Sequence, residues 1–550
     1  MAALVVATIA FLLPWVNRAF EIDEPLFLWS AEQILRAPSD FYGGQLNWYG
    51  SQQPFAQVIK NPPLNAFYLA AVGRFAGFGE RPLHLAMLPW SVAVIVGTYV
   101  LARRWGVPPL GSAALTLATP AVLVSSMSVM CDVPMLALWM WGLILWLRGL
   151  AEQRPASLAA SVVLMALCAL TKYLGVALVP LALVAGLLER RRPGGWLLWL
   201  AIPVAASIAF EFYLRDKYGT GAFLDAAGYA TKAVGENRLS FLGRGLVTLL
   251  FAGGALLPLS FLAPWLWSGR ELGSWGAVTL ALGAAFLVAG AVASGGASDY
   301  PLRTPAGVRW GALAQVTWFA VTGLQILALL ARELWSRRDT TAVLLVLWIA
   351  GVLVFAGWIN WSINVRSILP AVPAVAILAM RQIAARAPVA ADSARRRLAI
   401  PWIAGLVLSL AVCWADYSSA QANRAAAAAL IDRYSRHQSG SELWFSGHWG
   451  LQYYLQRAQA RPIDLRGSDL LDGDVLVIPE DNPGMFEVPA EWKIVQTLEE
   501  PVCGWLTTTS LTLQAAFYSS VLGPVPYYCG HVPPRKYFVY DPFRRAERER

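Results

Sequence analysis

Charged side chains are scarce in this sequence. Asp, Glu, Lys and Arg make up only 14% of its 550 residues, whereas 57% of the residues are hydrophobic. A soluble globular chain is usually about one quarter charged, so the composition excludes an ordinary soluble domain and indicates an integral membrane protein. The 25 tryptophans and 18 tyrosines fit this interpretation, because their rings settle at the boundaries between water and lipid.

Metal-binding residues are also scarce. The chain has four histidines and five cysteines, and the cysteines show no metal-ligand spacing. Cys168 and Cys413 lie inside apolar runs, where cysteine behaves as a small hydrophobic residue. Cys503 and Cys529 lie in the polar C-terminal region, and the sequence leaves open whether they form a disulfide. No motif requires a cofactor, and a divalent metal is an alternative without a motif to support it.

The excess of basic residues does not point to nucleic acid. The formal net charge is +9, but much of it lies in short arginine clusters between apolar segments. In a membrane protein such clusters mark the cytoplasmic ends of the spans. We therefore expect no nucleic-acid partner.

Apolar segments of nearly membrane-spanning length recur along the first 415 residues. A helix needs about 20 apolar residues to cross the hydrocarbon core, and this criterion predicts about thirteen transmembrane helices. They are expected near 2–18, 82–102, 108–127, 132–149, 156–171, 173–188, 195–213, 241–268, 274–294, 310–331, 341–359, 367–385 and 398–415. Residues 2–16 lack the basic start and the cleavage site of a signal peptide, so we expect a first span there.

Four arginine runs determine the expected orientation in the membrane. They occur at 103–104, 190–192, 337–338 and 395–397. An even number of predicted spans separates each run from the next, so all four lie on one face, which the positive-inside rule makes cytoplasmic. This topology places the long first loop 19–81 and the C-terminal region 416–550 on the extracytoplasmic face.

The C-terminal region has the pattern of a small α/β domain. SELWF (441–445) and DVLVIP (474–479) are typical of short strands, and WGLQYYLQRA (449–458) between them is typical of a helix. We therefore expect two domains, a transmembrane domain over 1–415 and an extracytoplasmic α/β domain over 416–550.

Two adjacent carboxylates, Asp23 and Glu24, follow the first apolar segment in NRAFEIDEPLFLWSAEQIL (17–35). Pro25 suits a first helical turn, so the pair is expected at a helix N-terminus beside the membrane, where the helix dipole favours ionised acids. The two acids either cap this helix or act as a general base or metal ligand at the membrane surface.

Asp132 and Lys172 are isolated charges between predicted spans. Asp132 stands in SSMSVMCDVPMLAL, and Lys172 stands in LCALTKYLGVALVP. Ionisable residues in such places are costly, and they usually face a cavity or a partner. Asp132 alternatively starts an ordinary helix, and Lys172 either snorkels to the interface or binds an anion in a wet cavity.

Two further cations are expected on the same face. Arg366, in WSINVRSILPAVPAVAIL, opens a late span, and its planar guanidinium suits a phosphate because it can bind two oxygens at once. An ordinary interface arginine would show the same pattern. Lys60 precedes the double proline of VIKNPPLNAFYLA, a stretch that is more often a structural hinge. Carboxylates and cations grouped beside lipid suit a substrate that carries phosphate on a lipid tail.

Taken together, these motifs resemble one family. An acidic pair after span one, an Asp-x-Pro start of span four, a Thr-Lys turn and RSILPAVP occur together in the GT-C membrane glycosyltransferases. The likeness is to the branch of protein O-mannosyltransferases and lipid A aminoarabinose transferases. GHWGLQYYLQ and the later GDVLVIP also resemble bacterial family 39 glycosyltransferases.

The resemblance implies a GT-C-like fold, a polyprenyl- or dolichyl-phosphate sugar as donor, and catalysis on the extracytoplasmic face. It places the general base at Asp23 with Glu24 beside it, and a second acid at Asp132. The residues expected at the donor phosphate are Lys172, Arg366 and Lys60.

The chain departs from the family pattern in two respects. It has no clear insertion of the MIR type and no histidine cluster, which counts against a eukaryote-type protein acceptor and against a metal requirement. His84, the only histidine of the membrane half, is expected to be an interface residue.

The leading expectation is therefore an inverting glycosyltransferase of the bacterial cytoplasmic membrane. It would move a sugar from a polyprenyl phosphate to a hydroxyl of a lipid, glycan or protein. A lipid or glycan transporter or flippase is the first alternative, although it would need ionisable groups near the bilayer midplane in related halves, and no internal repeat stands out. An assembly factor that works through its C-terminal domain is the second. The sequence identifies neither the sugar nor the acceptor.

Overall fold

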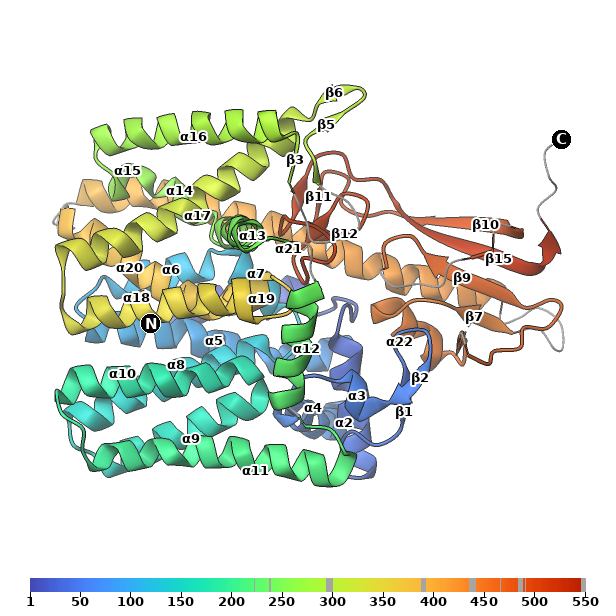
Figure 1. Cartoon of the computed structure of the whole chain (residues 1–550), viewed down its shortest axis with the longest axis horizontal. Coiled ribbons are helices and arrows are strands. Elements are labelled where there is room, and N and C mark those ends of the chain that lie inside the picture. Colours follow the sequence, from blue (N-terminus) through green and yellow to red (C-terminus); the bar gives the residue numbers. More distant parts are fainter. Residues whose placement is uncertain are drawn as a thin grey trace.

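A bundle of long helices and a region of β-sheet make up the chain. The computed structural model describes residues 1–221, 223–236, 239–292, 300–386, 392–434, 442–464, 466–482, 488–489 and 491–545. The long helices lie side by side, and the sheet lies beyond one end of the bundle (Figure 1). Shorter helices, among them α12 (Phe223–Glu236) and α19 (Val365–Ile368), lie between the bundle and the sheet (Figure 1).

The first 218 residues are mostly helical. The α-helices are α1 (Ala2–Leu12), α2 (Glu24–Arg36), α3 (Phe55–Val58), α4 (Leu64–Ala76), α5 (Glu80–Arg104), α6 (Pro109–Leu117), α7 (Pro120–Ser126), α8 (Asp132–Ala151), α9 (Pro155–Thr171), α10 (Leu178–Arg190) and α11 (Ala201–Tyr218). The 3₁₀ turns are η1 (Leu13–Trp15), η2 (Tyr173–Ala177) and η3 (Gly195–Leu200).

Helices also dominate the next 240 or so residues in chain order. After α12 come α13 (Phe241–Ala255), α14 (Pro258–Phe261), α15 (Ala263–Leu266), α16 (Gly269–Ala289), α17 (Trp310–Ser336), α18 (Thr340–Val354), the π-helical η4 (Phe355–Ile359), α19, the 3₁₀ turn η5 (Leu369–Ala371), α20 (Val372–Arg386), α21 (Asp392–Tyr434) and α22 (Trp449–Arg457).

The helices define a polytopic membrane protein. Among the described residues, nine helices are long and apolar enough to cross a membrane, and α6 with α7 makes ten if this pair, bent by 62°, is counted as one span. Three predicted spans correspond to shorter apolar helices, Ala2–Trp15, Pro155–Thr171 and Phe241–Ala255. The polytopic helical fold is confirmed, but the predicted thirteen spans exceed the nine or ten that helix length and composition support.

Proline and capping residues determine where several of these helices begin. Pro109, Pro120 and Pro155 occupy first helical positions, where the missing N–H costs no hydrogen bond. Ser268 and Glu271 exchange hydrogen bonds in a capping box at the start of α16. Because Pro120 begins a new helix just after α6 ends, the predicted span 108–127 is bent rather than straight.

The C-terminal region contains a five-stranded mixed sheet in the order β10-β15-β9-β7-β8. The strands are β7 (Leu443–Phe445), β8 (Arg461–Pro462), β9 (Val475–Pro479), β10 (Trp492–Glu500) and β15 (Arg535–Arg545). β7 pairs in parallel with β8 and β9, whereas β15 pairs antiparallel with β9 and β10. The two predicted strands and the helix between them are confirmed, and with them the mixed α/β character.

Short two-stranded ladders account for the other strands. They pair β1 (Gln45–Asn47) with β2 (Gln52–Pro54), β3 (Ala291–Val292) with β4 (Tyr300–Pro301), β5 (Arg303–Thr304) with β6 (Gly307–Val308), β11 (Leu506–Thr507) with β14 (Tyr528–Cys529), and β12 (Thr509–Ser510) with β13 (Ala515–Ala516). Cys503 and Cys529, whose pairing the sequence leaves open, are both free thiols in this structure.

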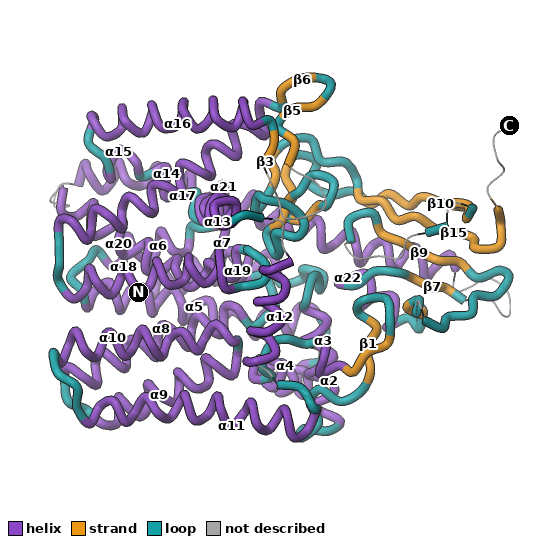
Figure 2. Tube along the Cα trace, viewed as in Figure 1, coloured by secondary structure: helices purple, strands orange, loops and turns teal. Residues whose placement is uncertain are grey.

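The 43-residue helix α21 joins the bundle to the C-terminal sheet. It packs against α7 and α14 within the bundle, and against α22 and β10 further along (Figure 2). Residue 416, where the sequence analysis divides the chain, therefore lies inside one continuous helix. The two parts are rigidly connected at this point rather than joined by a loop.

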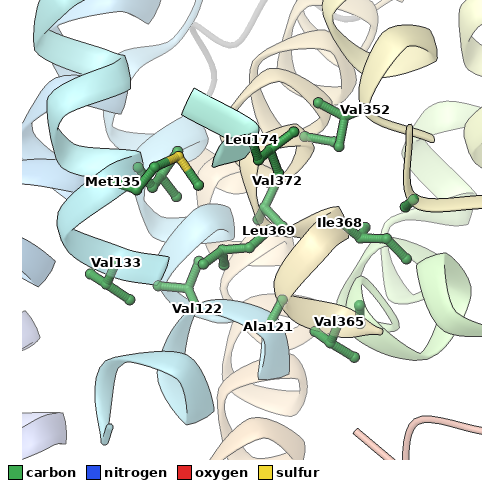
Figure 3. Close-up of a cluster of buried hydrophobic side chains, with 14 of the residues drawn as sticks. Ala121, Val122, Val133, Met135, Leu174, Val352, Val365, Ile368, Leu369 and Val372 are labelled. Atoms are coloured by element: carbon green, nitrogen blue, oxygen red, sulfur yellow. The ribbon is translucent and has the colours of Figure 1, made fainter. Parts of the chain in front are cut away.

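A cluster of buried aliphatic side chains lies where α7, α8 and the α19–α20 segment meet (Figure 3). Its members include Ala121, Val122, Val133, Met135, Val365, Ile368, Leu369 and Val372. Val133 directly follows Asp132, and Val365 directly precedes Arg366. The close packing of this cluster therefore fixes the backbone that carries both charged residues.

Helices α13 and α17 approach each other too closely for side chains at two glycines. A Cβ atom on Gly253 would lie 1.8 Å from the carbonyl oxygen of Phe319, and one on Gly323 would lie 2.3 Å from that of Leu249. Both positions therefore require glycine as long as the two backbones stay in contact.

We expect Gly253→Ala to destabilise the protein, because the added methyl group must push α13 and α17 apart at a cost of about 1–3 kcal/mol. Gly276→Ala in α16 is the matched control, since a Cβ atom there meets open space. Thermal unfolding in detergent should show a lower Tm for the first variant and an unchanged or higher Tm for the second. Equal Tm values would contradict the close packing.

Candidate active site

A cavity of about 290 Å³ lies among residues of α2, α12 and α19 and of the loops beside them. These helices lie between the bundle and the C-terminal sheet (Figure 1). Aromatic side chains form much of the cavity wall, together with aliphatic side chains, asparagines and charged groups. The predicted site residues that line it are Asp23, Lys60, Asp132, Lys172 and Arg366. The structure thus brings together five residues that the sequence spreads over more than three hundred positions.

Asp23 faces Arg366 across this cavity. One carboxylate oxygen of Asp23 accepts a hydrogen bond from Nη2 of Arg366 at 3.0 Å, and the two side chains are 30% and 15% exposed. Asp23 is the N-cap residue of α2, but its side chain makes no capping hydrogen bond. The capping alternative therefore does not hold for Asp23, whose carboxylate faces the cavity instead.

Arg366 has further contacts that hold its guanidinium in place. It donates to Sδ of Met130 at 2.9 Å and to the carbonyl oxygen of Tyr518 at 3.3 Å. Its side chain begins in the first turn of α19, whose N-cap residue Asn364 accepts a hydrogen bond from the backbone of Ser367. Arg366 is therefore an ordered cation at the cavity wall, not an arginine extended towards the membrane interface.

Asp132 and Lys172 form the second ion pair of the cavity. Nζ of Lys172 donates to Oδ1 of Asp132, and these side chains are 18% and 3% exposed. Asp132 lies in the first turn of α8, and Lys172 lies in extended backbone between α9 and η2. Lys172 thus turns inwards to a carboxylate, and the snorkelling alternative does not describe it.

Lys60 is the third cation of the cavity. Its ammonium donates to the carbonyl oxygen of Gln57 at 2.5 Å and lies 5.9 Å from the ring centre of Tyr229. Burial lowers the pKa of Lys60, while Asp225 acts in the opposite direction. The described lining residues include three cations and two carboxylates, and this excess of positive charge favours an anionic ligand.

Glu24 lies behind the cavity rather than in its wall. The side chain is fully buried, binds Arg18 at 2.7 Å, and accepts hydrogen bonds from the backbone N–H groups of Val129 and Glu21 at 2.8 and 2.6 Å. Burial opposes ionisation, but Arg18 and the hydrogen bonds prevail and lower the pKa of Glu24 to about 2. The carboxylate therefore joins the start of α2 to the loop that precedes Asp132.

Arg18 and Asp416 are buried charges that the sequence analysis overlooks. Nε of Arg18 donates to Asp416 at 2.8 Å, and Asp416 also accepts from the hydroxyls of Thr508 and Tyr518, each at 2.9 Å. Each charge stands at the end of a long apolar run, which is the signal that identifies Asp132. Applied to Arg18 and Asp416, the same criterion would have found both.

His84 belongs to this buried group, not to the membrane interface. Its side chain is 3% exposed and stacks on Phe20, with ring centres 5.7 Å apart. Nε2 of His84 lies 3.8 Å from Oε1 of Glu24. The expected interface position is therefore wrong. In the part of the chain that the structure describes, no group of three or more His, Cys, Asp or Glu side chains is arranged to hold a metal ion.

Two apolar grooves adjoin the cavity. One of about 240 Å³ lies along α8, α10 and α18, and it shares Leu174 and Phe355 with the cavity wall. The other, of about 380 Å³, lies along α10 and α11 and shares Phe223. A cavity that contains charged groups and has apolar grooves beside it suits a ligand with a charged head and a hydrocarbon chain.

One segment of the chain matches a known protein family. Residues 60–211 match the family model described as dolichyl-phosphate-mannose-protein mannosyltransferase. Over this segment, which contains Lys60, Asp132 and Lys172, the predicted resemblance is confirmed. No curated protein sequence matches the chain.

Two solved structures are similar to this chain at low identity. ArnT from Cupriavidus metallidurans, in a crystal structure bound to undecaprenyl phosphate, has 15% identity and a TM-score of 0.45, over 87% of this chain and 93% of that one. The archaeal oligosaccharyltransferase AglB from Archaeoglobus fulgidus, in complex with an inhibitory peptide and a dolichol-phosphate, has 13% identity and a TM-score of 0.46. That match covers 84% of this chain and 64% of AglB.

The burial of the Glu21 carboxyl can be tested through the pH dependence of the stability of the protein. The carboxyl is 3% exposed and accepts a hydrogen bond from Asn423 at 2.7 Å. Burial raises its pKa from 4.5 to about 7, although Arg535 opposes the shift. Between these values the folded chain binds a proton that the unfolded chain has lost, so this carboxyl makes stability fall as pH rises from 4.5 to 7.

We expect Glu21→Gln to remove this pH-dependent loss of stability, because the amide stays neutral and can still accept a hydrogen bond from Asn423. The Tm in detergent should fall less between pH 5 and pH 8 in the variant than in the parent protein, and the gain should be largest at pH 8. Parallel Tm curves for the two proteins would contradict the raised pKa.

Proposed function

We propose that this protein is a glycosyltransferase that moves a sugar from a polyprenyl phosphate to a hydroxyl acceptor, with inversion. The observation that carries the proposal is the cavity itself, where two carboxylates and three cations meet beside an apolar groove. The family match over residues 60–211 supports the same class of reaction. A phosphate on a lipid chain fits both the charge and the apolar surroundings of this site.

Asp23 is the proposed general base. Its carboxylate accepts the proton of the acceptor hydroxyl as the oxygen forms a bond to the anomeric carbon of the sugar. The bond from that carbon to the phosphate oxygen breaks on the opposite side, and its electron pair leaves with the phosphate. The ion pair with Arg366 keeps the carboxylate of Asp23 directed into the cavity until the substrates bind.

The three cations are the proposed site for the donor phosphate. Arg366 offers a planar group of donors, and Lys172 and Lys60 offer compact positive charges from other walls of the cavity. They stabilise the negative charge that builds up on the departing phosphate, which is where fixed charges accelerate a transfer most. Asp132 holds Lys172 in position, and Glu24 supports Asp23 from behind instead of contacting substrate.

The hydrocarbon chain of the donor is proposed to lie in the groove along α8, α10 and α18. Trp139, Leu181, Trp348 and Gly351 line it, and Leu174 stands where the groove meets the cavity. Burying each methylene group there contributes about 0.8 kcal/mol, so a long isoprenoid is held mainly by its tail. The charged cavity then needs to recognise only the phosphate and the sugar.

The proposed reaction takes place outside the cytoplasm. The arginine runs at 103–104, 190–192 and 337–338 mark the cytoplasmic end of the bundle, and the cavity opens at the other end. We therefore place the protein in the bacterial cytoplasmic membrane, with the cavity and the region 416–550 on the extracytoplasmic side. The acceptor can be a lipid, a glycan or a protein that reaches this surface.

We expect Asp23→Asn to lower kcat for sugar transfer by about 100-fold or more, because the amide cannot accept the proton. Purified protein in lipid is assayed with a panel of radiolabelled undecaprenyl-phosphate sugars and cell-envelope extract as acceptor. Asp472→Asn, an exposed acid of the C-terminal region, is the control and should keep full activity. Full transfer by the Asp23 variant would refute its role as base, and no transfer by wild type from any donor would favour transport or assembly.

Gly351→Phe tests the groove, because the ring would occupy space that the donor chain needs. For an undecaprenyl donor we expect KM to rise by about tenfold, whereas a donor with a two-isoprene chain should be unaffected. Gly276→Phe on α16, where open space surrounds the Cβ position, should change neither value. An equal effect of Gly351→Phe on both donors would place the chain elsewhere.

A further inference from the structure

The segment directly before Arg366 is held by a segment from the C-terminal region of the chain. The backbone N–H of Val365 donates to the carbonyl oxygen of Phe517 at 3.1 Å, and that of Ser520 donates to Ile363 at 2.8 Å. These bonds resemble the pairing of two strands, although neither segment is a strand. The segment 517–520 thus fixes the backbone of 362–365, directly before Arg366.

Side chains strengthen the same contact. The hydroxyls of Ser362 and Ser519 lie 2.7 Å apart in a hydrogen bond, and the backbone of Ile363 donates to the hydroxyl of Ser520 at 3.0 Å. Ser362 is 1% exposed and Ser520 is 5% exposed, so water does not compete for these bonds. The approach to α19 therefore depends on the C-terminal region for its conformation.

Tyr518 contacts the guanidinium of Arg366 in two ways. Its carbonyl oxygen accepts from Nη2 at 3.3 Å, and its ring centre lies 5.6 Å from Cζ, within range of a cation–π interaction. Asp23 binds the guanidinium as well, so the carboxylate and the tyrosine together restrict where it can point. An arginine side chain has many rotamers, and each contact of this kind reduces the number that it can adopt.

Tyr518 itself is held in place by the buried charges. Its hydroxyl donates to Asp416 at 2.9 Å and accepts from Nη2 of Arg18 at 3.4 Å. Its side chain is 2% exposed, and the ring packs edge-on against Phe517, with ring centres 5.1 Å apart. The ring therefore cannot turn away from Arg366 without breaking a hydrogen bond to a buried carboxylate.

We propose that Tyr518 is a positioning residue for Arg366, and that through it the C-terminal region completes the site for the donor phosphate. This inference depends on the proposed function in one respect, the assignment of Arg366 to the donor phosphate. Tyr518 acts through the arginine and does not line the cavity. A group that must meet a phosphate within a few tenths of an ångström gains from such support by its neighbours.

The test measures the affinity of the full-length protein in nanodiscs for undecaprenyl phosphate without a sugar. Tyr518→Leu removes the ring and the hydroxyl, and we expect it to weaken binding by about tenfold. Tyr518→Phe keeps the ring and loses only the tether to Asp416, so a loss of about threefold is expected. Tyr527→Leu is the matched control, because Tyr527 is an equally buried tyrosine of the same region that bonds to Gly254. It should leave the affinity unchanged.

The decisive measurement repeats each Tyr518 substitution in an Arg366→Gln background. If Tyr518 acts through Arg366, the double variant binds no more weakly than Arg366→Gln alone. Equal losses in both backgrounds, or wild-type affinity for Tyr518→Leu, would overturn the proposal. Should Tyr518→Leu fail to fold, Tyr518→Phe carries the same comparison.

The outcomes also separate this proposal from the proposed function. Non-additive losses without sugar transfer from any donor would leave Tyr518 as the positioning residue of a lipid-phosphate site and refute the transferase. Transfer together with additive losses would keep the transferase and refute the role of Tyr518. No binding of undecaprenyl phosphate to the wild-type protein would overturn both assignments.

Discussion

The buried guanidinium of Arg18 links parts of the chain that lie far apart in sequence. It binds Glu24 at the start of the first loop and Asp416 in α21, and Asp416 holds Tyr518 of the C-terminal region. A buried charge that loses its partner is very costly, so these segments stay together. The position of the Asp23 backbone is fixed in the same way, because Asp23 directly precedes Glu24 in the chain.

The charges of the cavity are arranged as neighbouring pairs of opposite sign. Asp23 contacts Arg366, and Asp132 contacts Lys172, so each acid has a cation as its direct partner. Such pairs also keep long cationic side chains ordered before a ligand arrives, which lowers the entropy lost on binding. Under the proposed function, the donor phosphate would share these cations without a large rearrangement of the site.

Asp132 and Lys172 are identifiable from sequence as isolated charges in apolar surroundings, because an unpaired charge there is costly. The partners remain hidden, since Asp23 and Arg366 are 343 residues apart. The same criterion, applied to the end of each apolar run, would also find Arg18 and Asp416, but local pattern cannot separate Glu24 from its neighbour Asp23. The strands β7 and β9 are predictable, whereas the position of β15 between β9 and β10 depends on contacts distant in sequence.

The continuity of α21 and the contacts beyond it affect the order in which the protein matures. Synthesis produces Arg18 and Arg366 long before the residues that hold them in place, Asp416 and Tyr518. A nascent chain that ends before residue 500 has every residue of the cavity wall but lacks Tyr518, which holds Arg366 in place. The site therefore takes its final form only after the segment 517–520 has been synthesised, because that segment holds the backbone directly before Arg366.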